Sequence, residues 1–282
     1  MQFQKVQKTT ILDYPKHLVI YAKPKIGKTD LVSRLPDCGI IDIEGGSDYI
    51  RGYIHVVKDE KNDPIQTLKN LDECLNWLIA EKPYKYVAFD TMTAFEEAAE
   101  IECTYDYMNS SIGKNFNVVD EDLIKLHPHL APAKDVKITH DSPYFQLVTN
   151  VLSNGAGYKW LRETYKKYFN KMKMAGERVI FICHIKDKFI DTKAGAEVTG
   201  RELDLTGKLK SITTSFVDTI GYLNRGKDGN TYLSFQAGES VAEGSRRGNL
   251  SGRNILIGEW DKEKKDYKTV HWNEIYPDVE IK

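Results

Sequence analysis

Residues 22–29, with the sequence AKPKIGKT, carry a glycine, a lysine and a hydroxyl in the order used by phosphate-binding loops. In such a loop, backbone N–H groups and the start of a helix converge on the phosphates of a nucleotide. The lysine reaches the β and γ oxygens, and the hydroxyl ligates Mg²⁺. We therefore predict a P-loop that binds ATP or GTP with Mg²⁺. Its predicted nucleotide-binding residues are Ala22, Lys23, Pro24, Lys25, Ile26, Gly27, Lys28, Thr29 and Asp30.

The surroundings of this loop favour the same interpretation. An apolar run at residues 18–21 precedes it, and a helix-like run at 30–35 follows it. This is the strand–loop–helix context that a P-loop requires, whereas a chance Gly-Lys-Thr sequence in a turn is the alternative. Ala22 stands where the P-loop pattern begins with glycine. We expect this substitution to be tolerated, since it costs free energy only if the residue needs a positive φ.

Asp90 follows the buried-strand sequence YVAF. In a parallel sheet, ligands bind at the carboxyl ends of the strands, so an acid at this point can face a nucleotide. This is the Walker B position, at which a carboxylate holds Mg²⁺ through water while the P-loop hydroxyl of Thr29 binds the ion directly. The alternative is an acid that caps the helix beginning at Thr91, and Asp90 could do both.

Two more strand ends complete a predicted catalytic set with Lys28. Glu44 ends the run GIIDIE before two glycines, and its carboxylate could orient and deprotonate the attacking water. The alternative is a surface acid. His184 follows the run RVIFIC and could donate an imidazole N–H toward the γ-phosphate, reporting its loss to the following segment. The alternative is a solvated histidine.

The elements that position these residues alternate between strand and helix, which predicts an α/β protein with a mostly parallel twisted sheet and flanking helices. Residues 109–153 lack periodicity and form either an insertion with short elements of its own or a mobile loop. Residues 186–210 show neither the helical nor the strand pattern of apolar residues and are predicted as a loop. The predicted strands are 17–21, 39–44, 54–57, 86–90, 178–183, 217–224, 231–235, 254–260 and 267–272, and the main helices 64–81, 94–108 and one from 157. We divide the chain into a core, 1–225, and a C-terminal antiparallel β-hairpin extension, 226–282.

Composition restricts the partners and the compartment. The 282 residues carry a net charge of −1, so any polyanion site must be a local patch. The four cysteines lack metal-ligand spacing, and neither a leader sequence nor a membrane-spanning run is recognisable. We expect a cytoplasmic protein with reduced thiols and no membrane partner.

The order of P-loop, IIDIE, VAFD and IFICH resembles the core of RecA-type ATPases over residues 17 to about 225. It is most similar to the phage-encoded Sak-group ATPases of single-strand annealing and recombination. The resemblance implies a RecA-like P-loop NTPase core that acts in the host cytoplasm if phage-encoded. It also implies that Asp48 or Tyr49 lies near the adenine, that Thr29 and Asp90 hold the metal, and that Glu44 holds the water.

The resemblance further implies a single-stranded DNA partner, because RecA-type cores hold DNA with the loop after the sensor strand. Here that loop, 186–210, carries six basic and five acidic residues. The candidates for DNA contact are Lys186, Lys188, Lys193 and Arg201. A solvated loop without DNA is the alternative, and the basic helix face within 158–173 is a second candidate surface. The alternative function is a nucleotide-switched ATPase that acts on protein partners in replication, packaging or host defence.

Assembly is also implied by the resemblance, since RecA-type enzymes place lysines that follow the sensor loop on a neighbour's γ-phosphate. Lys208 and Lys210 occupy that position, and Arg246 and Arg247 are rival arginine fingers. Only Lys23 and Lys25 supply further basic groups near the P-loop in the sequence. We therefore expect a homo-oligomer, filament or ring, whose activity depends on assembly, with a single-strand-binding protein as a further partner.

Overall fold

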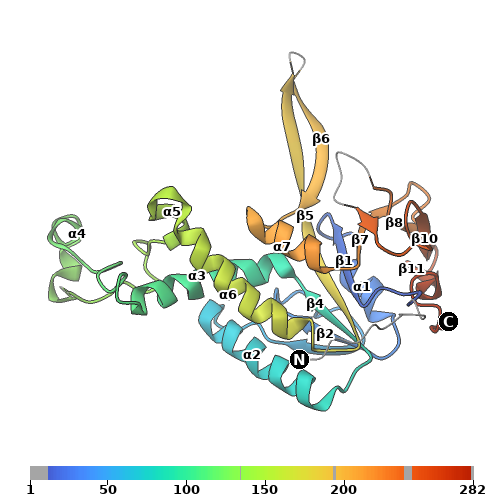
Figure 1. Ribbon diagram of the computed structural model, residues 1–282, viewed down its shortest axis with the longest axis horizontal. Coiled ribbons are helices and arrows are strands. Elements are labelled where there is room, and N and C mark those ends of the chain that lie inside the picture. The colour runs from blue at the N-terminus through green and yellow to red at the C-terminus, as the bar shows by residue number, and fades with distance from the viewer. Residues whose placement is uncertain (1–11, 134, 193–194, 238–242, 281–282) are drawn as a thin grey trace, which may run out of the picture.

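The computed structural model describes residues 12–133, 135–192, 195–237 and 243–280. In this part of the chain, helices flank a large mixed sheet with the spatial order β11-β10-β8-β7-β1-β5-β4-β2-β3 (Figure 1). The predicted α/β class is confirmed, with a mostly parallel centre and an antiparallel C-terminal part. The parallel strands, in spatial order, are β3 (Tyr53–Val56), β2 (Cys38–Asp42), β4 (Tyr86–Asp90), β5 (Arg178–Thr192), β1 (His17–Ala22) and β7 (Thr219–Arg225).

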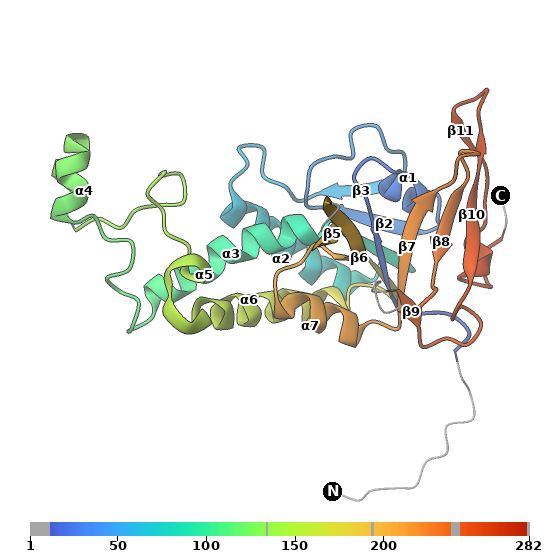
Figure 2. The ribbon, with the colours of Figure 1, turned by 90° about the horizontal axis from the view of Figure 1, so that it is seen from above.

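The central strands are buried on both faces, which explains why they read as apolar runs in the sequence. Successive side chains of a strand point to opposite faces. Val19 and Tyr21 of β1 accordingly join one apolar cluster, and Leu18 and Ile20 join another. The first cluster lies under α2, α3 and α6, whereas α1 and the C-terminal strands cover the second (Figure 2). The α-helices are α1 (Lys28–Ser33), α2 (Pro64–Glu81), α3 (Met92–Asn109), α4 (Glu121–Leu126), α5 (Val148–Val151), α6 (Gly157–Met172) and α7 (Lys208–Phe216).

The C-terminal segment continues the central sheet. Beyond β7 the sheet is extended by β8 (Thr231–Ser234), β10 (Asn254–Asp261) and β11 (Asp266–Val270), all antiparallel, and the two-residue strand β9 (Gly244–Ser245) also pairs with β7. The predicted extension therefore shares hydrogen-bonded strands with the core. The division into domains at 225/226 stays a prediction.

The prediction of a loop at 186–210 is wrong. The segment continues β5, turns back as β6 (Gly195–Leu203) and enters α7. The β5–β6 hairpin stands away from the body of the molecule (Figure 1). Apolar alternation arises where one face of a strand is buried. A ribbon that leaves the core lacks that constraint, so its sequence shows no strand period.

The segment 109–153 has short elements of its own. It contains α4, α5 and a 3₁₀ helix, Pro128–Ala133, and it projects from the end of α3 (Figures 1 and 2). Asn117 ties its two ends together: its side chain donates to the Gln146 carbonyl at 2.8 Å and accepts the Gln146 N–H at 3.0 Å. Within the described ranges, no helix has the length and apolar character needed to cross a bilayer.

Candidate nucleotide-binding site

The predicted P-loop connects β1 to α1. Ala22 is the last residue of β1 and has an extended backbone, so alanine is accepted where the P-loop pattern has glycine. The left-handed positions of the loop are instead Lys25, with φ of 62°, and Gly27, with φ of 95°. Gly27 immediately precedes α1, and glycine suits this position because it reaches positive φ without a steric penalty.

Lys28 lies across the loop with 6% of its surface exposed. Its ammonium donates to the carbonyl of Lys23 and to Nδ1 of His184, each at 3.3 Å. Burial lowers the pKa of Lys28, and the charges of Asp90 and Glu44 oppose that shift. The start of α1, the end of β4, the middle of β5 and the segment after β2 thus bring together Lys28 and the four other predicted catalytic or metal-binding side chains.

Thr29 and Asp90 are in direct contact. The Thr29 hydroxyl donates to the Asp90 carboxylate at 2.5 Å. Burial raises the pKa of Asp90 to about 6, against the opposing effects of the Thr29 hydrogen bond and the Lys28 charge. The helix-capping alternative for Asp90 is not realised, because the Thr91 hydroxyl caps α3 by accepting the Ala94 N–H at 3.2 Å. A hydroxyl beside a carboxylate is an oxygen donor set that suits Mg²⁺.

Glu44 and His184 form the second half of the site. The Nε2 atom of His184 lies 3.2 Å from Oε2 of Glu44. An ammonium only donates hydrogen bonds, so Nδ1 of His184 accepts from Lys28 and the ring proton resides on Nε2. This hydrogen bond from His184 lowers the pKa of Glu44, and the charge of Lys28 acts in the same direction. Glu44 is therefore an ionised acceptor with 48% of its side chain exposed.

Asp42 is a structural residue of the site that the sequence analysis did not assign. Strand β2 ends at Asp42, two residues earlier than predicted. The Asp42 carboxylate accepts the N–H groups of Gly45 at 2.7 Å and of Ser47 at 3.1 Å, and it also accepts the Ser47 hydroxyl. These bonds fix the turn that carries Glu44. The acid pair in IIDIE was the available signal, but only the second acid reaches His184.

A cavity of about 430 Å³ lies over the P-loop. Small-molecule sites generally have this size. Neither Asp48 nor Tyr49 lines the cavity, and Tyr49 is 97% exposed, so their role at the adenine stays a prediction. The lining consists of Pro24, Lys25, Gly27, Lys28, Thr29, Asp30, Asp42, Glu44, Gly46, Ile50, Asp90, Thr91 and His184.

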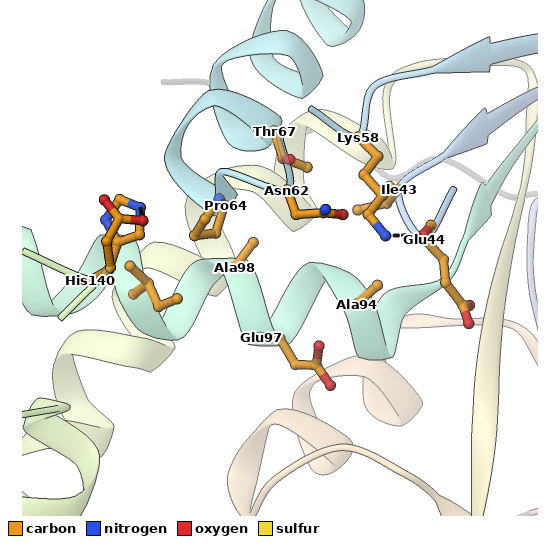
Figure 3. A pocket seen from close by; sticks show the side chains of 12 residues that line it. Ile43, Glu44, Lys58, Asn62, Pro64, Thr67, Ala94, Glu97, Ala98 and His140 are labelled. Atoms are coloured by element: carbon orange, nitrogen blue, oxygen red, sulfur yellow. Dashed lines mark hydrogen bonds and ion pairs between the residues drawn. The ribbon is translucent and has the colours of Figure 1, made fainter. Parts of the chain in front are cut away.

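A second cavity of about 430 Å³ lies on the other side of Glu44, between α2, α3 and the 109–153 segment (Figure 3). Lys58 donates to the backbone carbonyl of Glu44 at 2.8 Å, shown by the dashed line in Figure 3. His140 lines the far end of this cavity, where its ring contacts the Tyr105 hydroxyl at 2.9 Å. Glu44 therefore lies between the P-loop cavity and this one.

The DNA-contact candidates are carried by the β5–β6 hairpin. Lys186 is exposed, and Lys188 is part of β5, whereas Lys193 lies outside the described residues. Arg201 lies over the Tyr222 ring, 5.1 Å from its centre, and 3.9 Å from Asp187. Asp187 also lies 3.9 Å from Lys23 of the P-loop, which joins the root of the hairpin to the nucleotide site.

The candidate fingers lie in two different parts of the fold, α7 and the segment after β9. Lys208 is exposed at the start of α7, and Lys210 forms an ion pair with Glu202. Arg246 donates to the Ser215 carbonyl at 2.7 Å, and Arg247 donates to the Leu12 carbonyl. These two arginines follow β9, which pairs with the start of β7, at the edge opposite the P-loop. They could therefore reach only the nucleotide of another copy.

Arg225 is a basic residue close to the P-loop that sequence reasoning missed. Its Nη2 atom lies 3.6 Å from the position that a Cβ would take at Gly27, and the Tyr267 hydroxyl lies 3.5 Å from the same position. Arg225 ends β7, which pairs in parallel with the P-loop strand. The predicted strand 217–224 stops one residue before this arginine, and only the order of strands in the sheet shows that Arg225 lies beside the P-loop.

Comparisons with known proteins agree with a nucleotide site at this place. Residues 15–122 match the family described as an AAA domain, and this span includes the P-loop, Glu44 and Asp90. The match supports a P-loop ATPase domain over less than half of the chain. A search of curated proteins finds no match.

Two solved structures match this chain at low sequence identity and with low TM-scores. One is a prototypical ATPase from the type III secretion system of pathogenic bacteria, with 9% identity, a TM-score of 0.40 and coverage of 78% of this chain. The other is the RadB recombinase, with 11% identity, a TM-score of 0.40 and coverage of 86% of this chain and 88% of its own. The chain spans 60% of the secretion ATPase.

Proposed function

We propose that this chain binds ATP with Mg²⁺ and hydrolyses it at the P-loop. The observation that carries the proposal is the contact between the Thr29 hydroxyl and the Asp90 carboxylate, 2.5 Å apart, beside the Lys28 ammonium and open to the cavity. A magnesium ion needs oxygen ligands, and a phosphate chain needs a cation. These residues supply both, from segments separated by 61 positions in the chain.

The residues present suit the proposed ligands. Thr29 would bind Mg²⁺ directly and Asp90 would hold its water shell, while Lys28 would meet the β and γ oxygens. Bound Mg²⁺ would neutralise charge on the phosphates. Glu44, ionised and half exposed, can accept a proton from the attacking water. His184 orients the Glu44 carboxylate through its Nε2 proton.

Substitution of Lys28 tests this proposal. Lys28→Ala removes the ammonium that would bind the phosphates, and charge-assisted hydrogen bonds contribute about 1.5–3 kcal/mol each. We expect ATP affinity to fall by roughly 10- to 100-fold or more, measured by calorimetry on the folded variant. Lys114→Ala, an exposed lysine in the 109–153 segment, is the control. Unchanged ATP affinity in Lys28→Ala would overturn the P-loop assignment.

We further propose single-stranded DNA as the partner, in recombination or strand annealing of the phage type. The position of the β5–β6 hairpin supports this, since it leaves the site one residue after the nucleotide-facing His184, and its root carries the exposed Lys186. Movement of His184 would be transmitted along a continuous strand. The hairpin would then report the state of the nucleotide to a bound strand.

A nucleotide-switched protein that acts on protein partners is the second candidate function. One observation favours it: two of the described basic groups near the hairpin root already lie beside acids. Arg201 lies near Asp187, and Lys210 pairs with Glu202. Such local neutralisation reduces the charge available to phosphates. A direct binding measurement with single-stranded DNA separates the two functions.

A further inference from the structure

The end of β7 overlies the P-loop. Strand β7 pairs in parallel with β1, with Tyr222 opposite Tyr21, and continues for three more residues to Arg225. The Arg225 guanidinium consequently lies beside the loop, with Nη2 3.6 Å from the Cβ position of Gly27. Gly27 directly precedes Lys28, the first residue of α1, so the guanidinium at the end of β7 and the ammonium of α1 lie at the same loop.

The C-terminal strands hold Arg225 in this place. Its guanidinium carbon lies 4.6 Å from the centre of the Trp260 ring on β10. Trp260 meets the Tyr267 ring edge-on, with centres 5.5 Å apart. The Tyr267 hydroxyl lies 3.0 Å from Thr231 Oγ1 and 3.5 Å from the Gly27 Cβ position. A stacked arginine retains its hydrogen-bond donors at the edge of the plane, so the Trp260 contact orients them without consuming them.

The charge of Arg225 has no carboxylate partner among the residues that the structure describes. Arg34, which lies over the Tyr267 ring, differs, since it pairs with Asp30 and Asp266. Arg225 is exposed. A stacked, unpaired guanidinium next to a phosphate-binding loop is an arrangement suited to an anion.

We propose that Arg225 is a nucleotide-binding residue that contacts the phosphates of a nucleotide bound to the same chain. The inference rests on the proposed function and extends it. The guanidinium presents paired donors to phosphate oxygens from the side of β1 opposite His184, because β7 and β5 are the two neighbours of β1 in the sheet. The expectation that only Lys23 and Lys25 accompany the P-loop is corrected, because the fold adds a third cation from residue 225.

The test compares two ligands that share phosphates and differ in the nucleoside. Arg225→Ala should lower the affinity for ADP and for inorganic tripolyphosphate by roughly 10- to 100-fold, measured by calorimetry. This is the range expected for the loss of charge-assisted hydrogen bonds. Lys227→Ala removes an equal charge from the adjacent exposed turn and should leave both affinities unchanged. Unchanged affinities in Arg225→Ala would overturn the inference. So would a loss for ADP alone, which would assign Arg225 to the nucleoside.

A double-mutant cycle tests the role of Trp260. Trp260→Ala should weaken the binding of both ligands less than Arg225→Ala does. In the Arg225→Ala background it should cause no further loss of affinity, because the effects of substituting residues in contact are not additive. Thermal unfolding verifies that each variant is folded. If Arg225→Ala unfolds, Arg225→Gln, which keeps much of the side-chain stem, takes its place. If Lys28→Ala abolishes binding while Arg225 variants bind normally, only the Arg225 inference fails. If Lys28→Ala binds normally, the proposed function fails.

Discussion

The Nδ1 atom of His184 accepts a hydrogen bond from the Lys28 ammonium at 3.3 Å. The opposite ring atom, Nε2, lies 3.2 Å from the Glu44 carboxylate. The imidazole therefore connects the cation that would bind phosphate with the acid that would activate water. A phosphate that draws the ammonium away would break the hydrogen bond to Nδ1.

His184→Ala should lower ATP turnover while leaving ATP affinity nearly unchanged. The substitution removes the group that orients Glu44, but it leaves Lys28, Thr29 and Asp90 in place. We expect a loss in kcat of about 10- to 100-fold, below the full effect of a general base. His271→Ala is the matched control, because His271 pairs with Glu259 at 3.0 Å in the C-terminal strands. Equal loss of kcat in both variants would indicate a general structural effect.

The pKa of Asp90 predicts a pH dependence for Mg²⁺. Burial raises this pKa to about 6, so the fraction of carboxylate falls as the pH drops through 6. Mg²⁺ needs the ionised form and competes with the proton. The gain in ADP affinity on adding Mg²⁺ should therefore be larger at pH 7.5 than at pH 5.5. Asp90→Asn should remove most of this gain, and an equal gain at both values in the wild type would contradict the assignment.

The DNA hypothesis predicts weak, salt-sensitive binding to single strands in the presence of ATP. Lys186→Ala should reduce affinity for an oligonucleotide and lower the slope of log K against log salt by about 0.7, the value for one phosphate contact. Nucleotide affinity should not change. Lys264→Ala, exposed in the β10–β11 turn, is the control. If the wild type binds no single strand at low salt, the protein-partner function is favoured.

The assembly hypothesis predicts that specific activity rises with protein concentration or with DNA. Fingers supplied by a neighbour raise turnover by about 10³–10⁵ in nucleotidases that use them. A Lys28→Ala protein keeps its fingers, and a Lys208→Ala/Lys210→Ala protein keeps its P-loop, so a mixture of the two should regain partial activity. A second mixture, with Arg246→Ala/Arg247→Ala, tests the rival arginines. Specific activity that is flat in every condition would exclude a finger in trans.

Local sequence patterns predicted much of the parallel core. Strands β1 and β4, and β5 as far as Cys183, are apolar runs because both of their faces are buried. Helix α2 shows an amphipathic period because only one of its faces is buried. Positions at or just after predicted strand ends also singled out Glu44, Asp90 and His184, which lie beside the P-loop residues Lys28 and Thr29. Such contacts follow from the parallel sheet, whose carboxyl ends meet at one edge.

The sequence analysis did not predict features that depend on contacts between distant segments of the chain. Arg225 lies near Gly27 because β7 is the neighbour of β1 in the sheet, a fact that no local pattern contains. The β5–β6 hairpin leaves the core and has no burial pattern. Asp42 was overlooked because its role is to accept hydrogen bonds from a turn, and the residue type alone did not distinguish it from Glu44.

The central claim is that the P-loop, Asp90 and Glu44 form one site of ATP hydrolysis, and Glu44→Gln tests it most directly. The amide keeps the shape of the side chain but cannot take a proton from water. Phosphate release and ATP affinity are measured on the same preparation with Mg²⁺. We predict that Glu44→Gln binds ATP as the wild type does and loses about 10²- to 10⁴-fold in turnover. Hydrolysis at the wild-type rate by Glu44→Gln, or no hydrolysis by the wild type under any condition, would contradict the account.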